Sequence, residues 1–425
     1  MCRSKNAGVA GYAEAFSPVQ SDSQTSEWYS YFENDVLGTG RQLCFYIIME
    51  NIREKEKGME LNIAVIPGDG IGPEITAAAM VVLETAAKTY GHTLHLQYVK
   101  ACSRAIEEFG EPLPEKSLKI CKEADAVLLG NTGLEKYKND PLEKRPEYAL
   151  LKLRKELGVT TNIRPVHLYT ELESLSPLNK EALSEGLDYL FVRDIAGGVL
   201  CSEQVKGTGV NGPEAYEYEY YNQKIVENTT HFAFQLAKER RKKVVSLDKA
   251  NVLGSSRLWR KTVTKIGEEY PEVELTHEYI DSAALKLIRM PWYYDVILTS
   301  NLFGDIISDE GTGLTGTTSL YGSAELSSFG KGLYTPNQLH YPDESMIGQQ
   351  KVSPIGMIMA VSLMFRCTFK LKKEAEAIER AVQKVIRQKL VTEDIYYKGA
   401  VKVSTEKIGY NVALEIEKGY NQVRK

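Results

Sequence analysis

Short apolar segments alternate with amphipathic helical patterns from Met59 onward, and this alternation limits the possible folds more than any other feature of the chain. The segment 61–66 has the composition of a buried strand, and a helical pattern with Ile75 and Ala79 on one face follows it. Strand patterns and helical patterns continue to alternate along most of the chain. This order is typical of an α/β fold.

The same patterns predict the individual elements. Strands are expected at 61–66, 94–99, 126–129, 188–192, 243–247, 273–280 and 295–300. Helices are expected around 75–86, 116–122, 150–157, 214–238, 255–269, 281–288, 355–369 and 373–388. The helix at 214–238 is predicted to be long and amphipathic. We find no internal repeat in the sequence.

The first 58 residues differ from the rest of the chain. They are rich in Ser, Gly, Asn and Gln, show no periodicity, and end in the charged run 53–57. Two interpretations stay open: a disordered or weakly docked extension, or a leader included by mistake, with Met49 or Met59 as the true start. No function is assigned to this segment.

The composition excludes several classes of protein. With 425 residues the chain is long enough for two domains or one large one. Its net charge of −5 gives no reason to expect nucleic acid or an anionic membrane as a partner. The six cysteines form no C-x-x-C pair, which argues against a zinc ribbon and fits a reducing, cytoplasmic environment. The apolar run 43–49 is too short to span a bilayer, and no convincing signal peptide precedes it.

The stretch 299–310 contains two carboxylates on one helical turn. Asp305 and Asp309 are four residues apart, so they share a helix face, and no Lys or Arg lies within four residues of them. A hard divalent cation such as Mg²⁺ or Mn²⁺ would relieve their repulsion. The alternative is an ordinary acidic pair on a solvated face, but the apolar neighbours Ile306 and Ile307 argue against full exposure.

Further charged residues follow predicted strands. Arg193 ends the strand 188–192, Arg164 precedes a proline, and Arg154 lies on a helix. Arginines in such places suit carboxylate recognition if they converge, although each alone is more simply a salt-bridge residue. Lys249 and Asp281 also follow strands. A lysine there suits proton transfer, and Asp281 would complete a set of three carboxylates with the pair on 299–310.

Five segments carry a family resemblance. They are IAVIPGDGIGPE from Ile63, LRKELGVTTNIRP from Leu153, VVSLDKANVL from Val244, YID at 279–281 and SNLFGDIISDE from Ser300. In this order they resemble the metal-dependent, β-decarboxylating hydroxyacid dehydrogenases, which include isopropylmalate, isocitrate, homoisocitrate and tartrate enzymes. The resemblance covers residues 61 to about 420.

The resemblance implies a two-domain α/β fold that is not of the Rossmann type. Residues 59–158 and 317–425, from both ends of the chain, would form the first domain on the cofactor side. Residues 159–316 would form the second domain, with the metal ligands and the dimer interface. A homodimer with shared active sites is implied, in which Lys249 and Asp281 reach the active site of the partner subunit.

The resemblance also implies roles for single residues. Arg154, Arg164 and Arg193 would hold the carboxylates of a small dicarboxylate substrate. Asp305, Asp309 and the partner subunit's Asp281 would bind Mg²⁺ or Mn²⁺. Lys249 would take the proton of the substrate hydroxyl while hydride leaves for NAD⁺, and CO₂ would then be lost. The residues expected at the cofactor are Ile71, Tyr341, Asp343 and Ser353.

In this family the helix with Arg154 meets the variable group of the substrate. Glu147, Leu150 and Leu151 match the isopropylmalate pattern, in which leucines receive a branched alkyl group. The expected substrate is therefore 3-isopropylmalate, an intermediate of leucine biosynthesis, or a close 2-alkylmalate. Isocitrate, homoisocitrate or tartrate are the alternatives.

The sequence departs from the family pattern in three places, one of which is Ser353, where the family has an Asn before a proline. Leu200 stands where the family has a tyrosine that protonates the enolate, and Cys201, a water or a tyrosine from 216–221 are the possible substitutes. The adenosine loop around 335–348 has lost its usual His and Gly, although Asp343 keeps the acidic position that meets the adenosine ribose of NAD. Tyr341 could stack on adenine. These departures favour a second hypothesis, a catalytically impaired paralogue that acts as a binding or regulatory subunit.

Overall fold

The computed structural model describes residues 58–203, 205–328, 330–337 and 343–423. The N-terminal segment 1–57, and with it the question of where the chain starts, lies outside the described residues, and so does Tyr341. Among the residues described, no helix is both long and apolar enough to cross a lipid bilayer.

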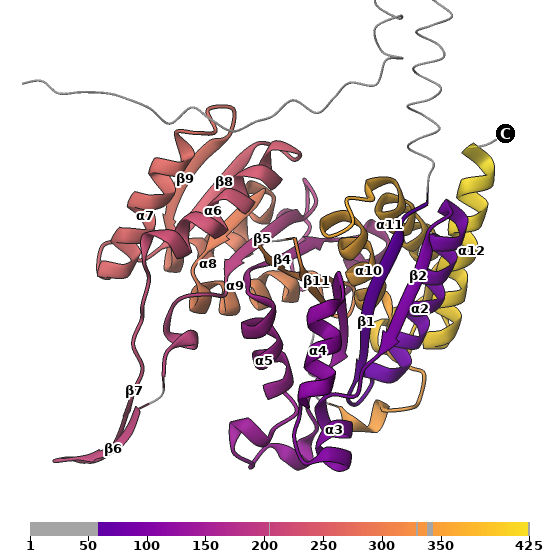
Figure 1. The fold of residues 1–425 in the computed structure, drawn as a ribbon. Helices are drawn as coiled ribbons and strands as arrows, with labels where there is room; N and C mark the ends of the chain where they lie inside the picture. Colours follow the sequence, from indigo (N-terminus) through magenta and orange to yellow (C-terminus); the bar gives the residue numbers. More distant parts are fainter. Residues whose placement is uncertain (1–57, 204, 329, 338–342, 424–425) are drawn as a thin grey trace, which may run out of the picture. The chain divides into compact units, whose positions relative to one another are not determined.

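Ten strands of the described region form one mixed sheet (Figure 1). Its order is β2 (Thr93–Tyr98), β1 (Glu60–Gly68), β3 (Ala126–Asn131), β12 (Gly332–Pro336), β11 (Gly322–Ser327), β4 (Val159–His167), β5 (Asp188–Asp194), β10 (Val296–Thr299), β8 (Lys243–Asp248) and β9 (Glu274–Tyr279). Neighbouring strands are parallel toward both edges, while the central pairs β12–β11, β11–β4 and β4–β5 are antiparallel. The α/β fold class predicted from the sequence is confirmed.

Helices cover both faces of this sheet. They are α2 (Gly72–Tyr90), α3 (Cys102–Phe109), α4 (Glu115–Glu123), α5 (Tyr148–Leu157), α6 (Gln223–Lys238), α7 (Gly254–Gly267), α8 (Ile280–Arg289), α9 (Asn301–Gly313), α10 (Ile355–Cys367), α11 (Lys372–Arg387) and α12 (Thr405–Val423). The centre of strand β1, residues 63–66, is apolar because both of its faces are buried. Ile63 and Val65 point into one buried cluster, and Ala64 and Ile66 point into another on the opposite face.

Both ends of the described region contribute to the same part of the fold. Helix α12 packs along α2, so the yellow C-terminal helix lies beside the indigo elements in Figure 1. Strands β11 and β12 insert between β3 and β4. This arrangement agrees with a first domain built from both chain ends. The proposed boundaries at 158/159 and 316/317 remain a prediction, because one continuous sheet passes through both proposed domains.

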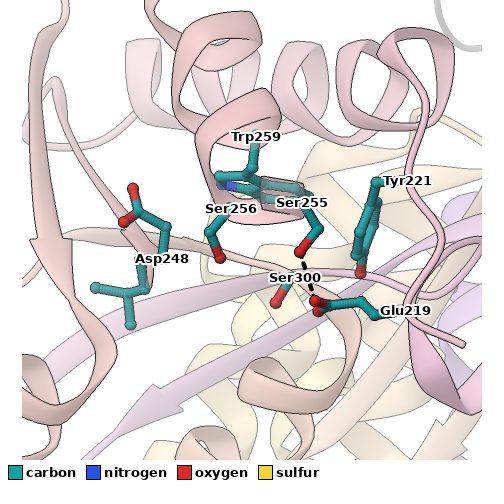
Figure 2. A pocket seen from close by; sticks show the side chains of 8 residues that line it. Glu219, Tyr221, Asp248, Ser255, Ser256, Trp259 and Ser300 are labelled. Carbon is teal, nitrogen blue, oxygen red and sulfur yellow. Dashed lines mark hydrogen bonds between the residues drawn. The ribbon is translucent and has the colours of Figure 1, made fainter. Parts of the chain in front are cut away.

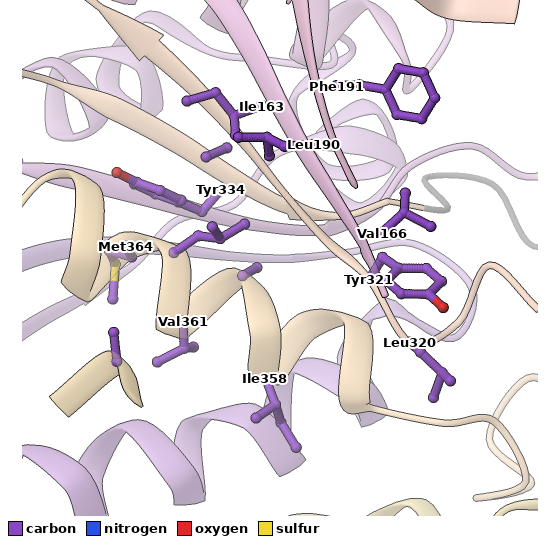
Figure 3. Packing of buried hydrophobic residues seen from close by; sticks show 14 of the residues in the cluster. Ile163, Val166, Leu190, Phe191, Leu320, Tyr321, Tyr334, Ile358, Val361 and Met364 are labelled. Carbon is purple, nitrogen blue, oxygen red and sulfur yellow. The ribbon is translucent and has the colours of Figure 1, made fainter. Parts of the chain in front are cut away.

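The centre of the sheet is packed against α10. Figure 3 shows Tyr334 of β12 and Ile163 of β4 near the side chains of Val361 and Met364, which belong to this helix. All four side chains are at most 2% exposed. Strands β11 and β12, in the antiparallel centre of the sheet, therefore rest on a closely packed layer of apolar side chains from α10.

The prediction of one helix over 214–238 is wrong at its N-terminal end. The helix begins only at Gln223, where the side chain of Asn222 caps it by accepting a hydrogen bond from the backbone N–H of Ile225. The preceding residues form a hairpin of β6 (Val205–Gly209) and β7 (Gly212–Tyr216). Its turn contains an Asn-Gly pair, which favours a tight hairpin turn over a helix. The sequence patterns also missed β4, β11, β12, α3 and α12.

Helix α9 lies unusually close to strand β5, and two glycines make this possible. A Cβ atom on Gly304 would lie 2.2 Å from Oγ1 of Thr299 and 2.7 Å from Cγ of Arg193. A Cβ atom on Gly311 would lie 2.6 Å from the ring of Phe191. Any side chain at these positions would force the helix away from the strand.

Gly311→Ala should therefore lower the free energy of unfolding by about 1–3 kcal/mol, since the added methyl overpacks the contact with Phe191. Gly313→Ala is the matched control, because a Cβ atom there would meet nothing within 4 Å. We expect the control to be as stable as the parent or slightly more stable. Urea unfolding followed by circular dichroism measures both, and equal unfolding midpoints for the two variants would contradict the close packing.

Candidate active site

Two of the predicted arginines lie side by side on the central strands. Arg193 ends β5, and the register places it opposite Asn162 of β4, so the two side chains share one face of the sheet. Arg164 lies two residues further along β4 and therefore on the same face. Both arginines are buried, at 6% exposure for Arg164 and 4% for Arg193.

The two carboxylates of α9 are the counter-charges of these arginines. Nη1 of Arg164 donates to Oδ1 of Asp309 at 3.1 Å, and Nη1 of Arg193 donates to Asp305. The guanidinium groups lie inside, whereas the side chain of Asp305 is 48% exposed and that of Asp309 is 72% exposed. The carboxylates thus lie between buried positive charge and the open side of the site.

Burial makes these arginines costly to charge, and their partners offset that cost. Burial, followed by the positive charge of Arg164, lowers the pKa of Arg193 to about 10. Burial likewise lowers the pKa of Arg164, which Asp309 and Asp305 counteract. Both groups stay positively charged at neutral pH, so the face of the sheet beside α9 is a cationic surface.

Arg154 reaches the same region from α5 and has a partner that the sequence patterns did not reveal. Its Nε and Nη2 atoms both donate to the carboxylate of Glu325, with Nε at 2.8 Å. Glu325 is buried on β11, opposite Asn162 in the register. No local feature of the sequence marks Glu325, because its partner is 171 residues away along the chain. The three predicted arginines therefore converge.

Lys249 and Asp281 form a separate pair. Nζ of Lys249 donates to Oδ1 of Asp281 at 2.6 Å, from the end of β8 to the first turn of α8. This hydrogen bond lowers the pKa of Asp281. No three His, Cys, Asp or Glu side chains gather into a metal-sized group within the described part of the chain. One chain thus brings Asp281 to Lys249 and not to Asp305 and Asp309.

A pocket lies beside the ends of β8 and β10 (Figure 2). Asp248 and Ser300 line it, and these residues directly precede Lys249 and Asn301 in the chain. Arg260 holds the carboxylate of Asp248 with two hydrogen bonds of 2.7 and 2.9 Å. The segment that carries Lys249 is thereby anchored from its buried side.

The predicted substrate helix presents its leucines differently. Leu150 is 5% exposed and packs in the cluster with Leu153, whereas Leu151 is 40% exposed. Glu147 precedes the first turn of α5, and one of its carboxylate oxygens is buried without a hydrogen-bond partner. Of the two leucines, Leu151 has the side chain that is free to contact a ligand.

Of the predicted cofactor residues, Ile71 and Asp343 belong to two segments that lie near each other. Ser353 lies just before the start of α10. Ile71 is buried at the start of α2, next to Gly70, and a Cβ atom on Gly70 would lie 3.8 Å from the side chain of Ile347. Asp343, four residues before Ile347, accepts hydrogen bonds from Ser345. Ser353 is buried, and its hydroxyl accepts a hydrogen bond from the N–H of Ile355 at the start of α10.

The region of the missing tyrosine contains two candidate replacements. Leu200 is 51% exposed, and the neighbouring Cys201 lies within 3.4 Å of the side-chain nitrogen of Asn301. Burial and the nearby charge of Asp194 raise the pKa of Cys201, so its thiol keeps the proton. The hydroxyl of Tyr221 accepts a hydrogen bond from the backbone N–H of Asn301 and is buried. Of the tyrosines in 216–221, Tyr221 therefore has its hydroxyl engaged in a structural hydrogen bond.

The donor set fits a hard divalent cation. The half-exposed carboxylates of Asp305 and Asp309 offer oxygen ligands of the kind that Mg²⁺ and Mn²⁺ prefer. The arginines behind them donate to one oxygen, Oδ1, of each carboxylate. Metal binding would therefore compete with these ion pairs.

Comparisons with known proteins show which family the chain resembles. A family model described as isocitrate/isopropylmalate dehydrogenase matches residues 62–412. Two 3-isopropylmalate dehydrogenases, from Clostridium acetobutylicum and Thermotoga maritima, are 45% and 44% identical, and each alignment covers 84% of this chain and 99% of the relative.

Solved structures show the same fold. An isocitrate dehydrogenase from Methylococcus capsulatus has a TM-score of 0.73 at 26% identity, over 84% of this chain and 99% of its own. A β-decarboxylating dehydrogenase from Thermococcus kodakarensis has a TM-score of 0.70 at 28% identity, over 86% and 98%. The predicted enzyme class, an oxidative, decarboxylating dehydrogenase, is confirmed. The chain belongs to the isocitrate/isopropylmalate dehydrogenase family.

Proposed function

We propose that the chain catalyses the NAD-dependent, divalent-metal-dependent oxidative decarboxylation of 3-isopropylmalate, or of a close 2-alkylmalate, as in leucine biosynthesis. The observation that carries this proposal is a set of four matched ion pairs: Arg154–Glu325, Arg164–Asp309, Arg193–Asp305 and Lys249–Asp281. Within these four pairs the charges sum to zero before any ligand binds.

This balance selects what can bind. A divalent cation alone would leave the site with excess positive charge, and a dicarboxylate alone would leave excess negative charge. A divalent cation and a dianionic substrate bound together keep the total at zero. The arrangement thus favours joint binding of a metal ion and a dicarboxylate, and it favours a dicarboxylate over a tricarboxylate such as isocitrate.

The residues of this chain take the following roles in the proposed reaction. The three arginines hold the carboxylates of the substrate and fix its orientation. The partner subunit's Lys249 removes the proton of the α-hydroxyl group, while the hydrogen on the same carbon leaves as hydride. The β-carboxylate then leaves as CO₂ when its C–C bond breaks, and a proton is returned to the enolate carbon.

Two bound groups complete this chemistry. NAD⁺, held by the segments with Ile71, Asp343 and Ser353, supplies the hydride acceptor when bound. A divalent cation held by Asp305, Asp309 and the partner subunit's Asp281 supplies Lewis-acid stabilisation of the negative charge that develops on oxygen.

The 3-isopropylmalate dehydrogenases among the relatives and the exposed side chain of Leu151 support the alkylmalate substrate. Leu151 lies three residues before Arg154 on α5, so both side chains share one face of the helix. An apolar side chain beside a carboxylate-binding arginine suits a malate with an alkyl substituent.

A homodimer is part of this proposal. Helices α8 and α9 expose large apolar side chains, namely Leu285, Ile288, Leu302 and Ile306. Such a face is costly to leave in water, and the same helices carry Asp281, Asp305 and Asp309. Pairing of two copies through this face would bring Asp281 of one subunit near the acidic pair of the other. We expect the enzyme to work in the cytoplasm.

The substrate assay tests the proposal directly. With Mn²⁺ and NAD⁺, we expect NADH formation from 3-isopropylmalate with a kcat/KM at least about tenfold above that for isocitrate, tartrate or malate. Removal of the metal with a chelator should abolish turnover. Absence of turnover on all four substrates, with NAD⁺ and NADP⁺ each tried, would refute the dehydrogenase proposal.

Mixing two inactive variants tests the shared site. Asp305→Asn and Asp281→Asn should each abolish metal-dependent turnover, since each removes one ligand from every site. Coexpressed in equal amounts, they should recover about a quarter of the parental activity, because half of the dimers are hybrid and each hybrid has one intact site. Coexpression of Asp305→Asn with Asp309→Asn is the control and should recover nothing. Equal activity in both mixtures would contradict ligand sharing.

Leu200 favours a second candidate function, that of an impaired paralogue acting as a binding or regulatory subunit. We expect Leu200→Tyr to raise kcat by up to about 100-fold, because a phenol hydroxyl at this position can protonate the enolate. Leu200→Phe is the matched control, with the same ring and no hydroxyl. Equal kcat values for the two variants would show that Cys201 or water is already an adequate donor.

A further inference from the structure

Asn301 holds the guanidinium of Arg193 on two of its three nitrogens. Its Oδ1 atom accepts hydrogen bonds from Nε at 3.1 Å and from Nη2 at 2.8 Å. Nη1 then points to Asp305. The orientation of the guanidinium plane is therefore fixed by Asn301, and only Nη1 faces the carboxylate on α9.

Asn301 itself has little freedom to move. It is 2% exposed, and its Nδ2 atom donates to the backbone oxygen of Gly197 at 2.8 Å. Its backbone N–H donates to the hydroxyl of Tyr221, also at 2.8 Å. The acceptor for Arg193 is thus anchored to the segment after β5 and to the segment before α6.

A related arrangement occurs on the neighbouring strand. Nε of Arg164 donates to Oδ1 of Asn162 at 2.8 Å. Its Nη1 atom donates both to Oγ of Ser308 at 2.8 Å and to Asp309 at 3.1 Å. Asn162 is fully buried and is held through its Nδ2 atom by the hydroxyl of Ser323 at 2.7 Å. Two buried arginines thus each have one asparagine at Nε and one carboxylate of α9 at Nη1.

We propose that Asn301 is a positioning residue for Arg193, and that Asn162 has the same role for Arg164. Each asparagine holds its guanidinium so that Nη1 faces the site, where it meets the α9 carboxylate or a carboxylate of the substrate. This inference rests on the proposed function, since it assumes that both arginines bind the substrate.

The physical reason lies in the length of the arginine side chain. A free arginine has many rotamers, and fixing it on substrate binding costs conformational entropy. A guanidinium that is already held at Nε loses less conformational entropy when the substrate binds. A neutral acceptor suits this purpose, because a carboxylate in place of Asn301 would cancel the charge that the substrate needs.

The first test is the kinetics of Asn301→Ala. We expect KM for 3-isopropylmalate to rise by about tenfold or more, while KM for NAD⁺ stays within about twofold of the parent. Ser246→Ala is the matched control. It removes another buried hydrogen bond of the same sheet, from Nε1 of Trp259 to Oγ of Ser246, in which neither arginine nor asparagine takes part. The control should keep the parental KM for 3-isopropylmalate even if its melting temperature falls equally.

The second test separates positioning from general destabilisation. Lysine at position 193 has no Nε–H, so the contact with Asn301 is absent in an Arg193→Lys background. There, Asn301→Ala should change KM for 3-isopropylmalate by no more than about twofold. An equal tenfold loss in both backgrounds would overturn the inference.

A crystal structure of Asn301→Ala decides the same question without turnover. We expect the Arg193 guanidinium to leave its present orientation or to become disordered, and an unchanged guanidinium would overturn the inference. Failure of the proposed function has a different signature, because the parental enzyme would then form no NADH from any of the substrates tried.

Discussion

The structure of this site depends on two buried guanidinium groups and the carboxylates that neutralise them. Arg164 and Arg193 lie on the central strands, where an unpaired charge would be very unfavourable. Helix α9 supplies the counter-charges, and it approaches β5 closely enough only because Gly304 and Gly311 have no side chains. Asn162 and Asn301 accept hydrogen bonds from the Nε atoms of the two arginines. The close packing of α9 on β5 and the neutralisation of the two buried arginines therefore depend on each other.

Much of the fold could be predicted from local sequence patterns. Parallel strands buried on both faces, such as β1 and β8, have mostly apolar centres and are easily recognised. Strand β4 was missed because Asn162, Arg164 and Pro165 interrupt its apolar pattern. The polar residues on β4 belong to the candidate active site. The 214–238 prediction failed for a different reason, since a helical period was extended back to residue 214, into the strand β7 that follows an Asn-Gly turn.

The candidate site was only partly visible in the sequence. The spacing of Asp305 and Asp309 predicts one helix face, and the structure agrees. Their counter-charges could not be found locally, because Arg193 and Arg164 lie 112 and 145 residues away along the chain. Glu325 and Asn301 were missed for the same reason. Such partners become neighbours only through the strand register, which a single sequence does not reveal.

The matching of charges in the site has a consequence for how substrate arrives. Each cation is already paired with a carboxylate, so the site has little net field to attract a dianion from a distance. Under the proposed function we therefore expect substrate capture by unassisted diffusion, at a rate that depends little on ionic strength. Discrimination between substrates would begin only at contact, when the carboxylates of the substrate replace those of α9. Such an enzyme would have a lower association rate for its substrate than one with an attractive field, and this rate would be nearly independent of ionic strength.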